Sequence, residues 1–216
     1  MNHPNDARRF APATQRNREP ILKVLRRVLP PTGTVLEVAS GSGEHAIFFA
    51  PRLKPRFWQP SEPEAILRES ILAWMNEVPS DNLFPPIPLN VAESVWSIES
   101  PDNSPVNVSE ITAIIAINLI HISPFTATLG LMAGAGRILP VGGILYLYGP
   151  YKQGGKHTAP SNQSFDEMLQ QQNPEWGVRN LEEVEAVALE NGLSLQEIVE
   201  MPANNLSVVF RREGGG

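Results

Sequence analysis

The sequence predicts an α/β protein in which a mostly parallel sheet carries helices on both faces. Apolar, β-branched segments alternate with segments of helical periodicity. This order gives five βα alternations, and two further strands close the chain as a β-hairpin. The length of 216 residues and the 42% hydrophobic content suit one compact domain. We expect a single domain over 1–216, with an N-terminal arm (1–16) and a flexible tail (213–216).

Helices are predicted where apolar residues recur at intervals of three and four. In residues 17–29, for example, Ile21, Val24, Leu25 and Val28 share one face, and Pro30 ends the helix. The expected helices are 17–29, 44–53, 61–78, 124–139 and 180–192. An S-x-x-E pattern at Ser61 and Glu64 predicts a capping box at the start of the third helix.

Strands are predicted where apolar, β-branched runs lie between turn residues. The run at 111–120 is almost continuously apolar, which is typical of a strand buried on both faces. The expected strands are 34–40, 56–62, 84–91, 111–120, 144–149, 193–202 and 205–212. Residues 151–180 are polar and too long for a simple connection, so we expect an active-site loop there.

Composition excludes several classes of function. The chain has no cysteine, so it has no disulfide, thiolate metal site or cysteine nucleophile, and we expect a cytoplasmic protein. No run approaches the length of a membrane span, and no signal peptide is evident. The net charge of −6 disfavours broad nucleic-acid binding, although the N-terminal residues are basic. The sequence does not indicate an oligomeric state.

A glycine-rich turn joins the first predicted strand to the next helix. Gly41 and Gly43 let backbone N–H groups approach a ligand at the start of that helix. Gly41 to Ala46 satisfies the G-x-G-x-x-A pattern of dinucleotide-binding proteins. Glu37, four residues before Gly41, favours the cationic methionine end of S-adenosylmethionine, because a carboxylate would repel a pyrophosphate. A glycine turn without a ligand remains an alternative.

Other residues at strand ends suit the remaining parts of that ligand. Glu62 lies nineteen residues after Gly43, where both ligand classes place an acid for the ribose diol. It could instead be a helix-stabilising carboxylate. Asn90 and Val91 could contact the adenine, or simply end a strand. The predicted cofactor-binding residues are Glu37, Ala39, Ser40, Gly41, Gly43, Glu62, Asn90, Val91 and Asn118.

The segment after the strand at 111–120 is expected to border the reacting group. Ligands of open α/β sheets lie beyond the carboxyl ends of the strands, which places Asn118 and His121 at the site. His121 could accept a proton from the methyl acceptor, or be structural. Tyr148 and Tyr151 could flank a sulfonium or line an acceptor pocket. Their segment could equally be a mobile lid. We predict His121 and Tyr151 as catalytic residues.

Several motifs in fixed order resemble a known family. They are "FAPATQRNREPIL", "VLEVASGSGEHA", "WQPSE", "NLIHISP", "LYGPY", "SNQSFDEML", "WGVRN" and "MPANN". Together they cover nearly the whole chain. The sequence resembles the class I S-adenosylmethionine-dependent methyltransferase-like family that includes methyltransferase-like protein twenty-six and many bacterial proteins of unknown function.

The resemblance implies a Rossmann-like class I methyltransferase fold with a seven-stranded sheet and an S-adenosylmethionine site. Members of the family usually have Asp where Glu62 stands and often have Asp where Asn90 stands, so a charge is lost at Asn90. Matching polar residues are candidates for the acceptor site, although salt-bridging or capping roles stay open. The predicted substrate residues are Asn17, Arg18, His121, Tyr148, Tyr151, Ser161, Asn162 and Arg179.

The predicted function is transfer of a methyl group from S-adenosylmethionine to a small oxygen or nitrogen nucleophile. The product would be S-adenosylhomocysteine, and no metal is expected. Two alternatives stay open. One is a catalytically silent module that binds the cofactor or a partner, and the other is an NAD(P)-binding oxidoreductase.

Overall fold

The computed structural model describes residues 6–100 and 105–214. Residues 1–5 of the predicted arm and 215–216 of the predicted tail lie outside the described residues. The chain divides into two compact units, and each is described by itself. Unit 1 consists of Met1–Asn90 and Trp96–Ala113, and unit 2 of Val91–Val95 and Ile114–Gly216. The single domain over 1–216 stays a prediction.

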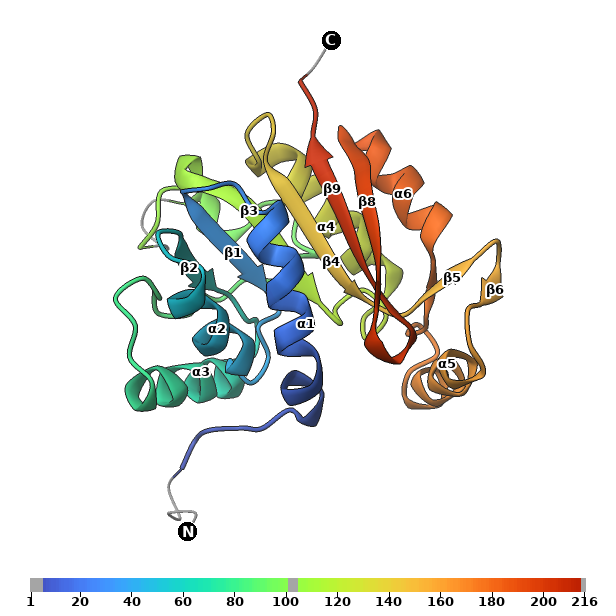
Figure 1. The fold of residues 1–216 in the computed structure, drawn as a ribbon, viewed down its shortest axis with the longest axis horizontal. Coiled ribbons are helices and arrows are strands. Elements are labelled where there is room, and N and C mark those ends of the chain that lie inside the picture. Colours follow the sequence, from blue (N-terminus) through green and yellow to red (C-terminus); the bar gives the residue numbers. More distant parts are fainter. Residues whose placement is uncertain (1–5, 101–104, 215–216) are drawn as a thin grey trace. The chain divides into compact units, whose positions relative to one another are not determined.

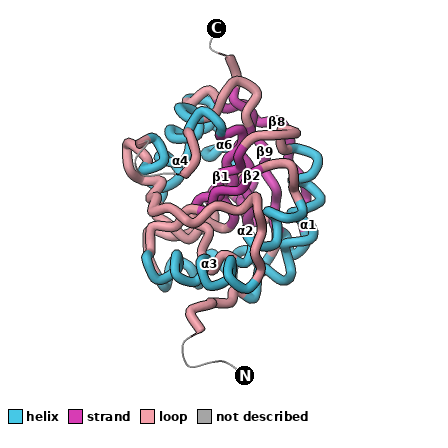
Figure 2. Tube along the Cα trace, turned by 90° about the vertical axis from the view of Figure 1, so that its left-hand side faces the viewer, coloured by secondary structure: helices cyan, strands magenta, loops and turns pink. Residues whose placement is uncertain are grey.

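Unit 1 contains three helices beside a pair of parallel strands (Figure 1). Its elements are α1 (Pro12–Val28), β1 (Thr34–Val38), α2 (Glu44–Phe49), β2 (Phe57–Pro60) and α3 (Ala65–Glu77). Helix α2 contacts both α1 and α3, as Figure 2 shows. The core includes Trp58 and Phe49, both fully buried, with ring centroids 5.7 Å apart.

Two helix starts in unit 1 differ from the prediction. Helix α1 begins at Pro12 rather than at residue 17, so part of the predicted arm is helical. Proline suits this first position because its fixed φ is helical and it needs no N–H partner there. The capping box at Ser61 is wrong, because α3 begins only at Ala65 and the Ser61 hydroxyl donates to the Glu37 carbonyl oxygen at 2.9 Å.

The predicted strand at 84–91 is reduced to isolated bridges. Trp58 pairs with Leu83 and Ser61 with Ile87, both in parallel. Prolines at positions 85, 86 and 88 have no N–H groups, so a continuous ladder cannot form along this segment. This segment accounts for a main sheet of six strands where seven were expected.

Unit 2 is built around three antiparallel strands and three helices (Figure 1). The strands are β4 (Ile144–Gly149), β8 (Leu193–Met201) and β9 (Asn205–Arg212), and the helices are α4 (Phe125–Ile138), α5 (Pro160–Gln172) and α6 (Leu181–Glu190). Strands β8 and β9 form the predicted C-terminal hairpin, and helix α6 contacts β8. Tyr146 and Phe210 are fully buried in this core.

The expected loop at 151–180 has its own secondary structure. It contains α5 and a small sheet, in the order β6-β5-β7, made of β5 (Tyr151–Gln153), β6 (Lys156–His157) and β7 (Arg179–Asn180). The sequence analysis did not anticipate these elements, and a role of the segment in the active site stays a prediction. The segment is rich in polar residues because side chains of its short elements bond to one another.

Strand β3 (Ile111–Ile117) contributes residues to both units. The order of the main sheet is β2-β1-β3-β4-β9-β8, and the sheet is mostly parallel, which confirms the predicted α/β class. Among the helices of the described residues, none combines the length and apolar character needed to cross a membrane.

Helix α4 provides a test of close packing in unit 2. A Cβ atom added at Gly130 would overlap the carbonyl oxygen of Val91. Alanine favours helix by about 1 kcal/mol over glycine, so a substitution free of this contact would stabilise the protein. We expect Gly130→Ala instead to lower the free energy of unfolding by at least about 2 kcal/mol, measured by urea denaturation.

Leu129→Ala is the control for this substitution, because Leu129 is 44% exposed in the same helix and its truncation should cost little. A Gly130→Ala variant as stable as the wild type would show that Val91 does not lie against the helix in this way.

Candidate functional site

The glycine turn after β1 has a left-handed backbone at three positions. Ala39, Gly41 and Gly43 have φ values of 51°, 56° and 89°. A side chain at Gly43 would collide with Ile71 of α3, since its Cβ would lie 2.8 Å from the Ile71 Cγ1 atom. Nothing lies within 4 Å of a Cβ position at Gly41. The turn is therefore packed against the protein at Gly43 and open to an incoming ligand at Gly41.

The Glu62 carboxylate joins this turn to the end of β2. Its Oε2 atom accepts a hydrogen bond from Gly41 N–H at 2.9 Å, and its Oε1 atom accepts one from Glu64 N–H at 3.1 Å. Burial raises the pKa of Glu62, while these N–H groups oppose that shift. A carboxylate has about four acceptor positions, so two remain for a diol.

Glu37 is a buried acid next to the last residue of strand β1. Its side chain is 2% exposed, and Trp58 Nε1–H donates to its Oε2 atom at 2.8 Å. Burial raises the pKa of Glu37 to about 8, and the nearby charge of Glu62 acts in the same direction. A cation brought next to Glu37 would favour its charged form.

The N-terminal arm lies against the glycine turn. Ala11 N–H donates to the Glu44 carboxylate, which also accepts from the Ser42 hydroxyl at 3.0 Å. Arg9 N–H donates to the Ser70 hydroxyl, which donates to the Ser42 carbonyl oxygen, each at 2.8 Å. Sequence reasoning did not assign Glu44, although an acid in the first turn of a helix is a recognisable signal.

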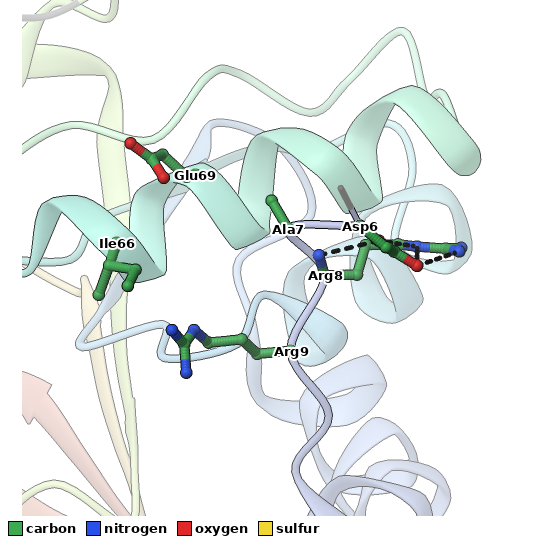
Figure 3. Close-up of a pocket in the computed structure, with 6 residues that line it drawn as sticks. All are labelled: Asp6, Ala7, Arg8, Arg9, Ile66 and Glu69. Atoms are coloured by element: carbon green, nitrogen blue, oxygen red, sulfur yellow. Dashed lines mark hydrogen bonds and ion pairs between the residues drawn. The ribbon is translucent and has the colours of Figure 1, made fainter. Parts of the chain in front are cut away.

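A surface hollow of about 360 Å³ lies beside the arm, as Figure 3 shows. Its lining residues are Asp6, Ala7, Arg8, Arg9, Ile66 and Glu69. Asp6 and Arg8 form an ion pair of 2.8 Å within the arm itself. The hollow is built by exposed and half-buried residues of the arm and by the first turns of α3, and it contains none of the predicted site residues.

Asn17 and Arg18 contact helix α2. The Asn17 Oδ1 atom lies 2.8 Å from His45 Nε2, and the Arg18 guanidinium lies over the Phe48 ring at 4.6 Å from its centroid. Burial lowers the pKa of His45 to about 4, and the charge of Arg18 adds to this effect. Both residues thus help to hold α1 against α2. Asn90, the remaining predicted residue of unit 1, is exposed.

In unit 2, Asn118 and His121 meet at Gly149. Asn118 has a left-handed backbone, with φ of 58°, and its N–H donates to the Tyr148 carbonyl oxygen at 2.8 Å. A Cβ at Gly149 would lie 2.5 Å from His121 Cε1 and 3.7 Å from Asn118 Oδ1. Only glycine at this strand end leaves room for the imidazole ring.

The imidazole of His121 is buried and neutral. The residue is 1% exposed, and its Nδ1 atom has no hydrogen-bond partner among the described residues. Burial lowers the pKa of His121 to about 3, and the charge of Arg179 contributes. A neutral imidazole can accept a hydrogen bond, but a pKa this low makes it a weak proton acceptor.

Two tyrosines lie at and just beyond the end of β4. Tyr151 is 1% exposed, burial raises its pKa, and its hydroxyl has no partner within the part of the chain that the structure describes. Tyr148 is also buried. A buried hydroxyl without a partner is uncommon in folded proteins, so Tyr151 keeps an unused capacity for a hydrogen bond.

Ser161 and Asn162, at the start of α5, contact the turn of the β8–β9 hairpin. The Asn162 amide donates to the Asn204 carbonyl oxygen at 2.9 Å, and the Asn204 amide donates to the Ser161 hydroxyl at 3.0 Å. Asn204 has φ of 59°. These contacts link the sequence motifs "SNQSF" and "MPANN" by holding a helix to a turn.

Asp166 connects three elements of unit 2. Its Oδ2 atom lies 2.8 Å from Lys152 Nζ and 3.2 Å from His157 Nε2, and its Oδ1 atom accepts from Val178 N–H at 2.7 Å. Burial alone would raise the pKa of Asp166, but the bond from Lys152 brings it below its ordinary value. We did not assign this residue from the sequence, because spacing alone does not show that it is buried.

Arg179 binds backbone carbonyl groups. Its Nε–H donates to the Ile120 oxygen at 2.9 Å, and its Nη2 donates to the oxygens of Ser123 and Glu175 at 2.6 and 2.9 Å. Three of its five N–H groups are therefore used within the protein. Among the described residues, no group of three or more His, Cys, Asp or Glu side chains could hold a metal ion.

The fold is similar to those of solved methyltransferases. An O-methyltransferase family protein from Burkholderia thailandensis has a TM-score of 0.73 at 12% identity, over 94% of this chain and 58% of that one. Human N-acetylserotonin methyltransferase, solved with S-adenosylmethionine, gives 0.73 at 12%, over 94% and 53%. A putative O-methyltransferase from Nostoc punctiforme gives 0.72 at 15%, over 92% and 56%. The chain thus spans little more than half the length of these proteins.

The sequence itself matches a protein family along nearly its whole length. The match extends over residues 8–212, and the family is described as a protein of unknown function. The likeness to methyltransferase-like protein twenty-six in particular stays a prediction. The chain belongs to the DUF938 family.

Proposed function

We propose that the protein is an S-adenosylmethionine-dependent methyltransferase of the cytoplasm that acts on a small-molecule acceptor. The observation that carries this proposal is the arrangement of Gly41 and Glu62, in which an open glycine turn is fastened to a carboxylate at the end of the next strand. The likeness in fold to methyltransferases, one of them solved with S-adenosylmethionine, supports it.

The residues that suit the methyl donor lie in unit 1. The Glu37 carboxylate suits the cationic methionine end, and the two remaining acceptor positions of Glu62 suit the ribose hydroxyls. Open space at Gly41 lets the backbone approach the ligand. Ala39 and Ser40 shape the same turn, with Ser40 N–H bonded to the Ser61 carbonyl oxygen. When bound, S-adenosylmethionine supplies an already activated methyl group.

The candidates for binding a methyl acceptor are Asn118, His121 and Tyr151, all in unit 2. The His121 Nδ1 atom and the Tyr151 hydroxyl are buried and lack hydrogen-bond partners among the described residues. Each can therefore form a hydrogen bond with a polar group of the methyl acceptor. Because the pKa of His121 is so low, we assign it the role of accepting a hydrogen bond from the nucleophile and orienting it. Positioning in a site that excludes water then provides most of the catalysis.

Ligand-dependent thermal stability tests donor binding. We expect S-adenosylmethionine and S-adenosylhomocysteine to stabilise the protein by about 2.7 kcal/mol at about a hundredfold excess over Kd. This corresponds to a rise of roughly 5–10 °C in Tm for a chain of this size. NADH should have no effect. Stabilisation by NADH alone would favour an oxidoreductase, and donor binding without any methyl transfer would favour a silent module.

Two glycines with nearly the same φ angle provide a matched pair of variants. Gly41 and Gly154 have φ of 56° and 57°, and neither has an atom within 4 Å of a Cβ position. Valine at either position should therefore cost a similar amount of stability, on the order of 1–2 kcal/mol. We expect only Gly41→Val to lose donor binding by isothermal titration. Equal binding by both variants would remove the glycine turn from the site.

The pKa of Glu37 predicts how stability and donor binding depend on pH. The folded state keeps the Glu37 proton up to pH about 8, whereas the ordinary pKa is 4.5. The wild type should therefore lose stability relative to Glu37→Gln as the pH rises between these values. Donor affinity should fall by up to about tenfold per pH unit below 8, because the charged form of Glu37 attracts the cationic end of the donor more strongly than the protonated form does.

The Glu37→Gln variant also serves as the control for this titration. The amine of S-adenosylmethionine titrates in both proteins, so the contribution of Glu37 is the difference between their pH profiles. Identical profiles for the wild type and the variant would show that Glu37 does not contact the donor.

A further inference from the structure

The loop that carries His121 is held by a second segment of unit 2. Two residues of that segment, Gly177 and Arg179, make bonds that fix the loop. Gly177 N–H donates to the His121 carbonyl oxygen at 3.0 Å, and Arg179 donates to the carbonyl oxygens of Ile120 and Ser123. The loop backbone is thus bound on both sides of His121 and at His121 itself.

The holding segment is itself anchored at its centre. Val178 N–H donates to Asp166 Oδ1, and a Cβ at Gly177 would lie 2.7 Å from the same oxygen. Glycine is therefore needed at position 177 for the chain to pass Asp166. The Asp166 carboxylate is fixed in turn by Lys152 and His157. Arg179 also bonds to the Glu175 carbonyl oxygen, which closes the segment on itself.

The ring of His121 is confined by the elements around it. Phe165 of α5 meets the imidazole edge to face, with centroids 5.8 Å apart, and Gly149 at the end of β4 leaves the space that the ring fills. The charged group that acts on the ring is the Arg179 guanidinium, which lowers its pKa. Packing and the position of the loop backbone hold the ring in this space, since no hydrogen bond holds its Nδ1 atom among the described residues.

We infer that Arg179 is a positioning residue that holds His121 buried and in register at the acceptor site, rather than a residue that binds the acceptor. Its fork of donors matches the carbonyl oxygens on either side of His121, a geometry that a lysine cannot reproduce. Asp166 acts one step further away, through the backbone of residues 177–178. The effect of Arg179 on catalysis rests on the proposed function. The bonds that hold His121 do not, because they lie within the protein itself.

Histidine NMR tests the inference without an acceptor or a donor. The chain has four histidines, so their ring signals can be assigned by comparison with His121→Gln. In the wild type, His121 should stay neutral down to a pH of about 3. In Arg179→Gln we expect its pKa to rise by about two pH units, because the loosened loop admits water. Arg179→Lys keeps the charge and should still show a rise of about one unit.

Arg212→Gln is the matched control. Arg212 also binds three backbone carbonyl oxygens in unit 2, those of Gly136, Gly192 and Glu213. Its loss should reduce stability without changing the titration of His121. If Arg179→Gln does not fold, Arg179→Lys and hydrogen exchange at Gly177 N–H give the same comparison, with loss of protection expected in Arg179→Lys alone.

Several results would overturn the inference. An unchanged titration of His121 in the Arg179 variants would show that the arginine does not hold the ring. The same rise of the His121 pKa in Arg212→Gln would mean that general destabilisation is the cause. If the His121 pKa rises in Arg179→Gln but keeps its wild-type value in Arg179→Lys, the arginine acts only through its charge. Donor binding is measured separately by thermal stability, so its failure would refute the proposed function and leave the positioning result standing.

Discussion

The hydrogen bond from Gly41 N–H to the Glu62 carboxylate is the contact on which the proposed methyl-donor site depends. It fixes the glycine turn to the end of β2, while Gly43 packs on Ile71 of α3. The turn can then hold a left-handed backbone at Ala39, a conformation that costs on the order of 1 kcal/mol for a residue with a side chain. Asn118 in unit 2 has the same kind of backbone, also directly after a strand.

The sequence was sufficient to predict the α/β class, the glycine turn and the C-terminal hairpin, because each depends on local patterns. The buried strand at 111–117, for example, is visible as a run of β-branched residues. The continuous strand predicted at 84–91 is wrong. Its apolar residues indicate burial, but its prolines lack the N–H groups that continuous pairing needs. The helix and short strands inside the expected loop at 151–180 were not visible in the sequence, since their order depends on non-local bonds to Asp166.

Residue types at the site were easier to predict than their roles. Arg179 and Asn17 were singled out as substrate residues, and their contacts are with the Ile120 and Ser123 carbonyls and with His45. An arginine that binds carbonyl oxygens and one that binds a ligand have the same sequence signal. What distinguishes them is the position of acceptors from distant parts of the chain. The sequence also does not show which titratable side chains are buried. Burial raises the pKa of Glu37 and keeps His121 neutral.

A crystal structure with S-adenosylhomocysteine would test the central claim most directly. We predict electron density for the ligand over the glycine turn, with its amino group near Glu37 and its ribose hydroxyls at Glu62. Density at another place on the protein, or a turn that stays empty at saturating ligand, would contradict the assignment of this turn as a methyl-donor site.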